Sequence, residues 1–268
     1  LAGHFDERFL RVPSEVLVSA MREHQRYFHL IDEAGQLLPV FLTVANVDSP
    51  KPEMVIKGNE RVITPRLTDA EFFYDKDLKQ PPAEWLESLK QVTYQAELGS
   101  YFEKAERLGS LSALIAGRMG IDETLAQRAG QLAKTDLVSG MVGEFPDLQG
   151  VMGEYYARAA GEASTVSLAI REHYQPRFAG DALPTGEVSQ AVALADRLDA
   201  LVGLFGINQP PTGSKDPFAL RRQAIGVVRI CVESQLPISP FTLVDDAVAG
   251  FAREFDGQPV KDYLTDRF

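Results

Sequence analysis

Basic side chains gather in the stretch TGSKDPFALRRQA, which holds Lys215, Arg221 and Arg222. Ammonium and guanidinium groups bind phosphate, and arginine can do so through two parallel hydrogen bonds. Asp216 is a favourable N-cap and Pro217 a favourable first helical residue, so both arginines would fall in the second turn of a helix. The stretch predicts either a phosphate-binding corner or a salt-bridged helix surface. Of the two roles, we favour the structural one for Arg221 and phosphate binding for Lys215.

A second basic group, Lys57, Arg61 and Arg66, lies earlier in the chain. With the corner just described, these residues are the candidates for contact with a nucleic-acid backbone. A salt-bridged surface is again the alternative. Arg229 precedes Glu233 by four residues, a spacing that indicates an ion pair along one helix face.

Two aspartates, Asp136 and Asp196, lie in helical patterns and could contribute to a metal site. Phosphohydrolases of the HD type hold a divalent ion with histidines from separate helices, a His-Asp dipeptide and a distal aspartate. In the tetrapeptide KTDL, Thr135 stands where the dipeptide requires histidine, and a hydroxyl replaces an imidazole poorly. A metal-dependent phosphohydrolase is therefore an alternative. We expect instead that these carboxylates anchor helices through hydrogen bonds and hold no metal.

Motifs for other chemistry do not occur in the sequence. It has no G-x-G-x-x-G after a strand, no G-x-x-x-x-G-K-[ST] and no G-x-S-x-G, so neither a self-contained ATP site nor a serine nucleophile elbow is expected. The histidines have no partner four residues away and no neighbouring cysteine: His4, His24, His29 and His173. We expect no catalytic residue and no cofactor within this chain.

Composition limits the partners. The 268 residues carry a formal net charge of −11, so any contact with a polyanion must come from local basic patches or from a larger assembly. No apolar run approaches the roughly 20 residues that a membrane-spanning helix needs, and no secretory signal is evident. A single cysteine, Cys231, lies in an apolar run and reads as a core residue. These features predict a cytoplasmic protein without a membrane partner.

The first part of the chain has an α/β pattern. A helix is predicted over residues 13–25 with Ser14 as its cap, followed by strands at 26–32 and 37–47 that form a hairpin. A helix is then expected through residues 59–79, starting or bending at Pro65 after the proline-containing segment DSPKPEM. Its expected buried face is formed by Leu67, Ala70, Phe72 and Phe73.

The pattern after residue 80 is almost entirely helical. Apolar residues recur every three or four positions from Leu86 to Ile115, and Asp122 is a cap candidate for the next helix. Pro81 and Pro82 interrupt the pattern between the two parts. The sequence thus predicts an α+β protein with a small α/β domain over residues 1–80 and a larger all-α domain over residues 81–268.

A set of segments in fixed order resembles one known family, the β subunit of the bacterial two-subunit glycyl-tRNA synthetases. The resemblance covers almost the whole chain and rests on AMREHQRYFHLIDEAGQLLPVFLTVANV, KGNERVITPRLTDAEFFYDKD, KTDLVSGMVGEFPDLQGVMGEYYA, HYQPRFAGDALP and NQPPTGSKDPFALRRQAIGVVRI. No single segment is as informative as the set.

The resemblance implies an α2β2 ligase. In such an enzyme the α subunit activates glycine with ATP and magnesium and charges the tRNA, while the β subunit contributes tRNA binding and assembly. It also implies that residues 81–268 form a degenerate HD domain, that this chain is a middle portion without catalytic residues, and that its partners are the α subunit and tRNA for glycine, with no role for DNA. A pure scaffold for the α subunit is a variant of this interpretation. Hydrolysis of mischarged tRNA by the first domain is another, although no pair of a nucleophile and a general base in that domain supports it.

Overall fold

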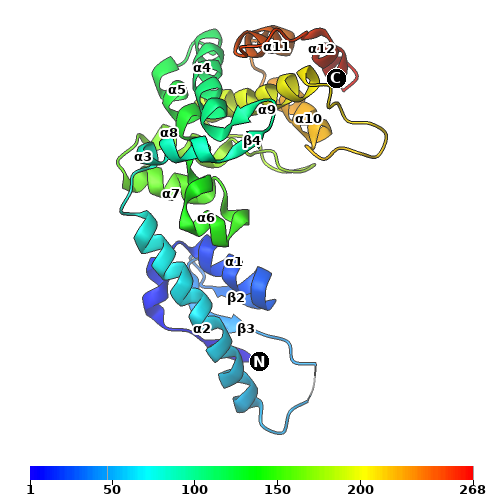
Figure 1. Ribbon diagram of the computed structural model, residues 1–268. Coiled ribbons are helices and arrows are strands. Elements are labelled where there is room, and N and C mark those ends of the chain that lie inside the picture. Colours follow the sequence, from blue (N-terminus) through cyan, green and yellow to red (C-terminus); the bar gives the residue numbers. More distant parts are fainter. Residues whose placement is uncertain (47, 268) are drawn as a thin grey trace. The chain divides into compact units, whose positions relative to one another are not determined.

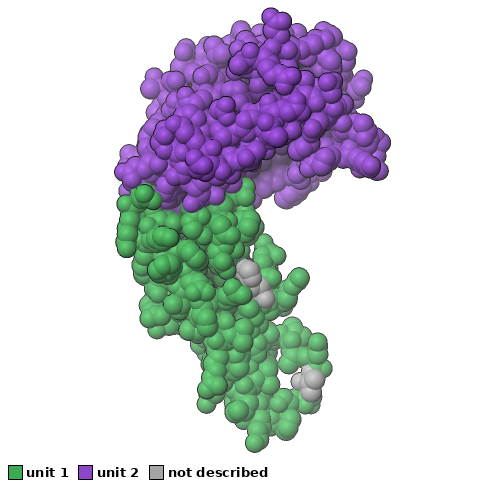
Figure 2. All heavy atoms as spheres, viewed as in Figure 1, with its two compact units in different colours: residues 1–80, 139–149 green, residues 81–138, 150–268 purple. Residues whose placement is uncertain are grey.

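The computed structural model describes residues 1–46 and 48–267, so Val47, the last residue of the second predicted strand, lies outside the described part. The protein has an α+β fold, with a small sheet near the N-terminus and many helices after it (Figure 1). The chain divides into two compact units, coloured separately in Figure 2. The first contains Leu1–Gln80 and Ser139–Gln149, and the second contains Pro81–Val138 and Gly150–Phe268. The segment 139–149 thus packs with the first unit, whereas the sequence-based division places it in the second.

The first unit is built on an antiparallel sheet with the strand order β1-β3-β2. The predicted hairpin is confirmed as β2 (Phe28–Ile31) and β3 (Leu37–Leu42), and β1 (Ala2–His4) adds a strand that the sequence pattern did not indicate. Gly3 lies opposite Phe41 in the pairing of β1 with β3, and a Cβ at Gly3 would come within 2.4 Å of the Phe41 ring. A glycine is therefore needed at this position for the strand to pair.

Helix α1 (Ser14–Gln25) lies where it was predicted, but Pro13 is its N-cap residue and Ser14 already belongs to the helix. The short 3-10 helix η1 (Glu7–Arg11) precedes it. The side chains of Val16, Leu17, Ala20 and Met21 are fully buried, as helical spacing predicted.

Helix α2 (Pro52–Asp77) is longer than predicted. It begins inside the segment expected to break the pattern, because proline is well suited to the first turn of a helix, and it continues through Pro65. Leu67 and Ala70 are buried as expected, whereas Phe72 is 61% exposed, so its predicted burial was wrong. At the C-terminus of α2, the Asp77 carboxylate accepts hydrogen bonds from the amides of Gly140 (3.0 Å) and Met141 (2.9 Å). It thereby caps α6 (Gly140–Glu144).

The second unit consists of helices around α9 (Glu187–Gly206), which is buried along almost its whole length. The apolar core of this unit joins residues of α4 and α9 to those of the helices that follow. The remaining long helices of the unit are α4 (Tyr101–Met119), α5 (Glu123–Leu132), α7 (Val151–Ala159), α8 (Ser164–Glu172), α10 (Leu220–Glu233), α11 (Pro240–Ala249) and α12 (Gln258–Thr265).

Residues 86–100 depart from the helical prediction. They form a 3-10 helix and a short hairpin, and the Ser100 and Glu103 side chains make a reciprocal capping box that starts α4. The predicted cap at Asp122 is confirmed, since its carboxylate accepts hydrogen bonds from the amides of Thr124 and Leu125. The other short elements are α3 (Pro82–Trp85), η2 (Glu87–Gln91), β4 (Thr93–Gln95), β5 (Gly99–Ser100), η3 (Thr135–Val138) and η4 (Pro146–Leu148). Within the described residues, no helix combines the length and apolarity needed to cross a membrane.

Candidate functional site

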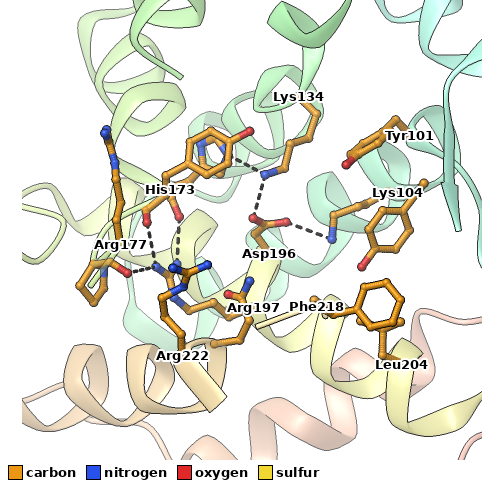
Figure 3. A pocket seen from close by; sticks show the side chains of 15 residues that line it. Tyr101, Lys104, Lys134, His173, Arg177, Asp196, Arg197, Leu204, Phe218 and Arg222 are labelled. Carbon is orange, nitrogen blue, oxygen red and sulfur yellow. Dashed lines mark hydrogen bonds and ion pairs between the residues drawn. The ribbon is translucent and has the colours of Figure 1, made fainter. Parts of the chain in front are cut away.

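The second unit contains a pocket of about 310 Å³ around Asp196 of α9 (Figure 3). Its lining comes from β4, α4, the turn after α5, the loop after α8, α9, the loop before α10 and the start of α10. Polar and aromatic side chains dominate this lining: Tyr94, Tyr101, Lys104, Lys134, His173, Tyr174, Arg177, Asp196, Arg197, Phe218, Arg222 and Gln223.

Asp196 binds two lysine side chains at once. Its Oδ1 lies 3.0 Å from Nζ of Lys104, and its Oδ2 lies 2.8 Å from Nζ of Lys134. Lys104 also contacts Asp199 at 2.8 Å, and Arg107 contacts the other oxygen of Asp199 at 2.6 Å. Burial alone would raise the pKa of Asp196, but the charges of Lys104 and Lys134 hold that pKa well below its usual value. The two carboxylates of α9 therefore fix cations from α4 and from the end of α5.

His173, at the end of α8, is the second partner of Lys134. Its Nε2 lies 2.9 Å from Nζ of Lys134, and its Nδ1 lies 2.7 Å from the carbonyl oxygen of Ile170. A carbonyl can only accept, so Nδ1 carries the hydrogen and Nε2 accepts from the ammonium group. Burial, together with the charge of Lys134, lowers the pKa of His173 well below its usual value. A lysine ammonium thus lies between a neutral histidine and an aspartate.

Arg197 holds the loop that follows α8. The residue is 3% exposed, and its guanidinium group donates to the carbonyl oxygens of His173 (2.9 Å), Ala193 (2.9 Å), Tyr174 (3.2 Å) and Pro176 (3.2 Å). Burial lowers the pKa of Arg197 to about 10. The Arg197 side chain has room because residue 226 is glycine, where a Cβ would lie 2.4 Å from Nε.

Arg177 and Arg222 lie at the rim of the pocket. Both residues are exposed, and within the described chain neither guanidinium group has a hydrogen-bond or ion-pair partner. Phe218, which is 39% exposed, also lines the pocket. The pocket therefore has guanidinium groups without a partner among the described residues, together with an exposed aromatic ring.

The predicted HD positions are not assembled around a metal. The Thr135 hydroxyl donates to the carbonyl oxygen of Leu132 (2.8 Å), and one Asp136 oxygen accepts from the amides of Gly150 (2.6 Å) and Gly153 (3.1 Å). Burial raises the pKa of Asp136 to about 6. No group of three or more His, Cys, Asp and Glu within residues 1–46 and 48–267 is arranged to hold a metal ion. The phosphohydrolase alternative therefore has no ligand set in the described chain, and the HD resemblance stays a prediction.

The basic side chains of the corner at residues 212–224 lie in different environments. The Asp216 carboxylate accepts from the amides of Leu220 (2.8 Å) and Arg221 (3.0 Å) and so caps the first amides of α10. Asp216 is not the predicted N-cap residue, because α10 begins at Leu220 with Ala219 as its N-cap, and Arg221 and Arg222 therefore lie in the first turn and not in the second. Arg221 donates to the carbonyl oxygen of Gly213, a structural contact. Lys215 is exposed in a turn, and Arg222 lines the pocket. The predicted ion pair of Arg229 with Glu233 is confirmed at 2.7 Å.

The basic group of the first unit is also divided. Lys57 and Arg61 lie one turn apart on α2, and both are exposed and line a shallow hollow with Glu60, Thr64 and Pro65. Arg66 instead forms an ion pair with Glu144 at 3.2 Å. Two of these three cations are therefore available to a ligand.

Comparison with known proteins identifies the family. The family model described as glycyl-tRNA synthetase beta subunit matches residues 1–268. The chain belongs to this family. Proteins named glycine–tRNA ligase beta subunit from Marinobacter nauticus and from Pseudomonas syringae are each 52% identical to it over 271 residues, and one from Hahella chejuensis is 51% identical over 276 residues. All of this chain is covered, but it spans only 39–40% of the length of these β subunits.

The pocket cations were largely missed by sequence reasoning. Lys104 interrupts the buried face of α4, and Lys134 directly precedes the degenerate dipeptide position. A lysine at a position that helical spacing assigns to the core is the signal that would have indicated a buried ion pair. Asp196 was identified, but its partners required the tertiary structure.

Proposed function

We propose that this chain is a tRNA-binding and assembly portion of the β subunit of a glycine–tRNA ligase. In the proposed α2β2 enzyme, the α subunit activates glycine with ATP and magnesium and charges tRNA for glycine. The observation that carries this proposal is the match of the family model over all 268 residues. The relatives bear the name of the ligase β subunit along the same stretch.

The distribution of exposed cations supports a role in tRNA binding. Lys57 and Arg61 on α2 and Lys215 at the corner are exposed, whereas Arg66 and Arg221 are engaged in contacts within the protein. Because the net charge is −11, an RNA backbone would be attracted only where such cations are locally concentrated. We therefore assign phosphate contacts to Lys57, Arg61 and Lys215, and an architectural role to Arg66 and Arg221.

The same proposal covers cofactors, location and partners. The chain uses no cofactor of its own, because ATP and magnesium act in the α subunit. It works in the cytoplasm with the α subunit and tRNA, and neither DNA nor a membrane is a partner.

Binding of tRNA specific for glycine to the chain, measured across a salt series, tests the proposal. The double variant Lys57→Gln with Arg61→Gln removes two available cations, so its affinity should fall and its salt slope should become shallower by about one for each lost phosphate contact. The matched control is Lys76→Gln with Lys79→Gln, which removes the same charge from exposed positions near the end of α2. Equal losses in both variants, or no binding by the unmodified chain at low salt, would refute phosphate contact at this site and leave the scaffold interpretation.

A further inference from the structure

We propose that the pocket around Asp196 binds one nucleotide-sized ligand, a phosphate group joined to a flat ring. The ligand is either a free nucleotide or a single nucleotide of an RNA, since both present the same chemistry. The inference goes beyond the proposed function and does not depend on it, because none of the cations assigned to tRNA contact, Lys57, Arg61 and Lys215, lines this pocket.

The lining of the pocket carries an excess of positive charge. Of the described side chains around the pocket, five are cationic, namely Lys104, Lys134, Arg177, Arg197 and Arg222, and one, Asp196, is a carboxylate. Behind them, Asp199 is already shared between Lys104 and Arg107. Positive charge therefore exceeds negative charge at this pocket in a chain whose net charge is −11. A concave, partly buried surface strengthens the resulting attraction for an anion.

The charged side chains of the pocket differ in whether they already have partners within the protein. Both oxygens of Asp196 are taken by the two lysines, so the carboxylate fixes these cations. The terminal nitrogens of Arg197 donate hydrogen bonds to backbone carbonyls, so this residue acts on a ligand only through its charge. Arg177 and Arg222 have no such engagement in the described part of the chain. Their forked donors are suited to hold phosphate oxygens.

Aromatic side chains form part of the pocket lining. Tyr94 and Tyr101 lie edge to face with ring centroids 5.4 Å apart, Tyr174 lies over Nζ of Lys134, and Phe218 lies at the rim. Aromatic rings that flank a cationic groove are the arrangement on which bases stack. A volume of about 310 Å³ is at the lower end of small-molecule pockets, which suits one nucleotide and excludes a folded RNA element.

Calorimetric titration of the chain with AMP at low ionic strength is the direct test, with adenosine and inorganic phosphate as separate probes. We expect AMP to bind more tightly than either probe alone, and inorganic phosphate to compete with it. Adenosine binding as tightly as AMP would overturn the proposal, because the cations would then have no role. Absence of AMP binding at millimolar concentration would overturn it as well.

The variants Arg177→Gln and Arg222→Gln locate the binding. Both residues are exposed, and neither guanidinium group has a partner among the described residues, so the fold should persist. Each change should weaken AMP affinity about tenfold, the effect of one lost charge-assisted hydrogen bond. Arg26→Gln is the matched control, an exposed arginine of the first unit with no assigned phosphate contact, and should leave AMP affinity unchanged. If both rim variants bind AMP as the unmodified chain does, the pocket is not the site and the proposal fails.

Competition with tRNA identifies the source of the nucleotide. Displacement of AMP by tRNA, with an affinity that Arg222→Gln lowers, would support occupation by a nucleotide of the RNA. AMP binding that tRNA does not displace would support a free nucleotide. A failure of AMP binding alongside normal tRNA binding would reject this inference and leave the proposed function intact.

Discussion

At the scale of single residues, Asp196 organises the second unit by charge. It pairs with two lysines, Lys104 of α4 and Lys134 just after α5. Both lysine side chains are almost fully buried. Such cations cannot remain buried without a partner, since an unpaired charge in a protein interior is strongly unfavourable. The carboxylate is therefore a structural requirement at the same place where it helps to shape an anion pocket.

Removing the Asp196 carboxylate should strongly destabilise the folded protein. We expect Asp196→Asn to lower the free energy of unfolding by roughly 3–5 kcal/mol, because it leaves Lys134 buried without a carboxylate partner and Lys104 paired with Asp199 alone. Urea denaturation followed by circular dichroism measures the change. Asp266→Asn is the control, an exposed aspartate whose replacement should stay within about 0.5 kcal/mol. A loss below about 1 kcal/mol for Asp196→Asn would show that the lysines find other partners.

Whereas the pKa of Asp196 is lowered, the pKa of Asp136 is raised. Burial raises its pKa to about 6 in the folded state, against 3.8 for a free side chain, so the folded protein binds the extra proton between these pH values. The contribution of Asp136 to stability is therefore greatest below about pH 4 and declines as the pH rises through 6. In Asp136→Asn this decline, on the order of 2 kcal/mol, should be absent. Unfolding free energies of both proteins at pH 4.5 and 7.5 test the prediction, which a pH-independent difference between them would contradict.

At the scale of elements, caps and prolines decide where helices begin. Helix α2 starts at Pro52 although the surrounding sequence reads as a break, since proline at the first turn loses no hydrogen bond. Helix α10 starts at Leu220, after Ala219 in a left-handed conformation, with the Asp216 carboxylate bound to its first amides. The residue types indicated the helices, and the local backbone set their first residues.

The Asp216 cap should be measurable by itself. Asp216→Ala leaves the amides of Leu220 and Arg221 without their acceptor and should destabilise the protein by about 1 kcal/mol. Ser214→Ala, at an exposed position of the same loop, should have almost no effect. Thermal denaturation of the two variants gives the comparison. Equal melting temperatures would mean that the cap contributes nothing to stability.

At the scale of the whole molecule, the first compact unit is discontinuous in sequence. The segment Ser139–Gln149 returns to it, where α6 packs against α2 and η4 packs against α1. The Ser19 hydroxyl donates to the Asp147 carboxylate at 2.8 Å, and Asp77 caps α6. Residues 1–80 alone therefore lack part of their own core.

A fragment comparison tests this organisation. Residues 1–80 joined through a flexible linker to residues 139–149 should unfold cooperatively at a higher urea concentration than residues 1–80 alone, because the added segment restores buried contacts and satisfies Asp77. Circular dichroism in urea is the measurement. Identical transitions of the two fragments would show that the returning segment adds no stability.

The sequence by itself determined the family, the α+β class, the hairpin, most helices and the cap at Asp122. These features depend on local periodicity and on residues close together in the chain, as with Asp122 and the amides of Thr124 and Leu125. Misplaced features, such as the burial of Phe72 and the helix through residues 86–100, depended on what packs against them. Only the tertiary structure decided that Lys104 and Lys134 meet Asp196 across 92 and 62 positions of sequence, and that Arg222 lies at the rim of their pocket. Charge pairing acts through space, so a lysine read along the chain does not reveal whether its partner is water, a carboxylate or a ligand.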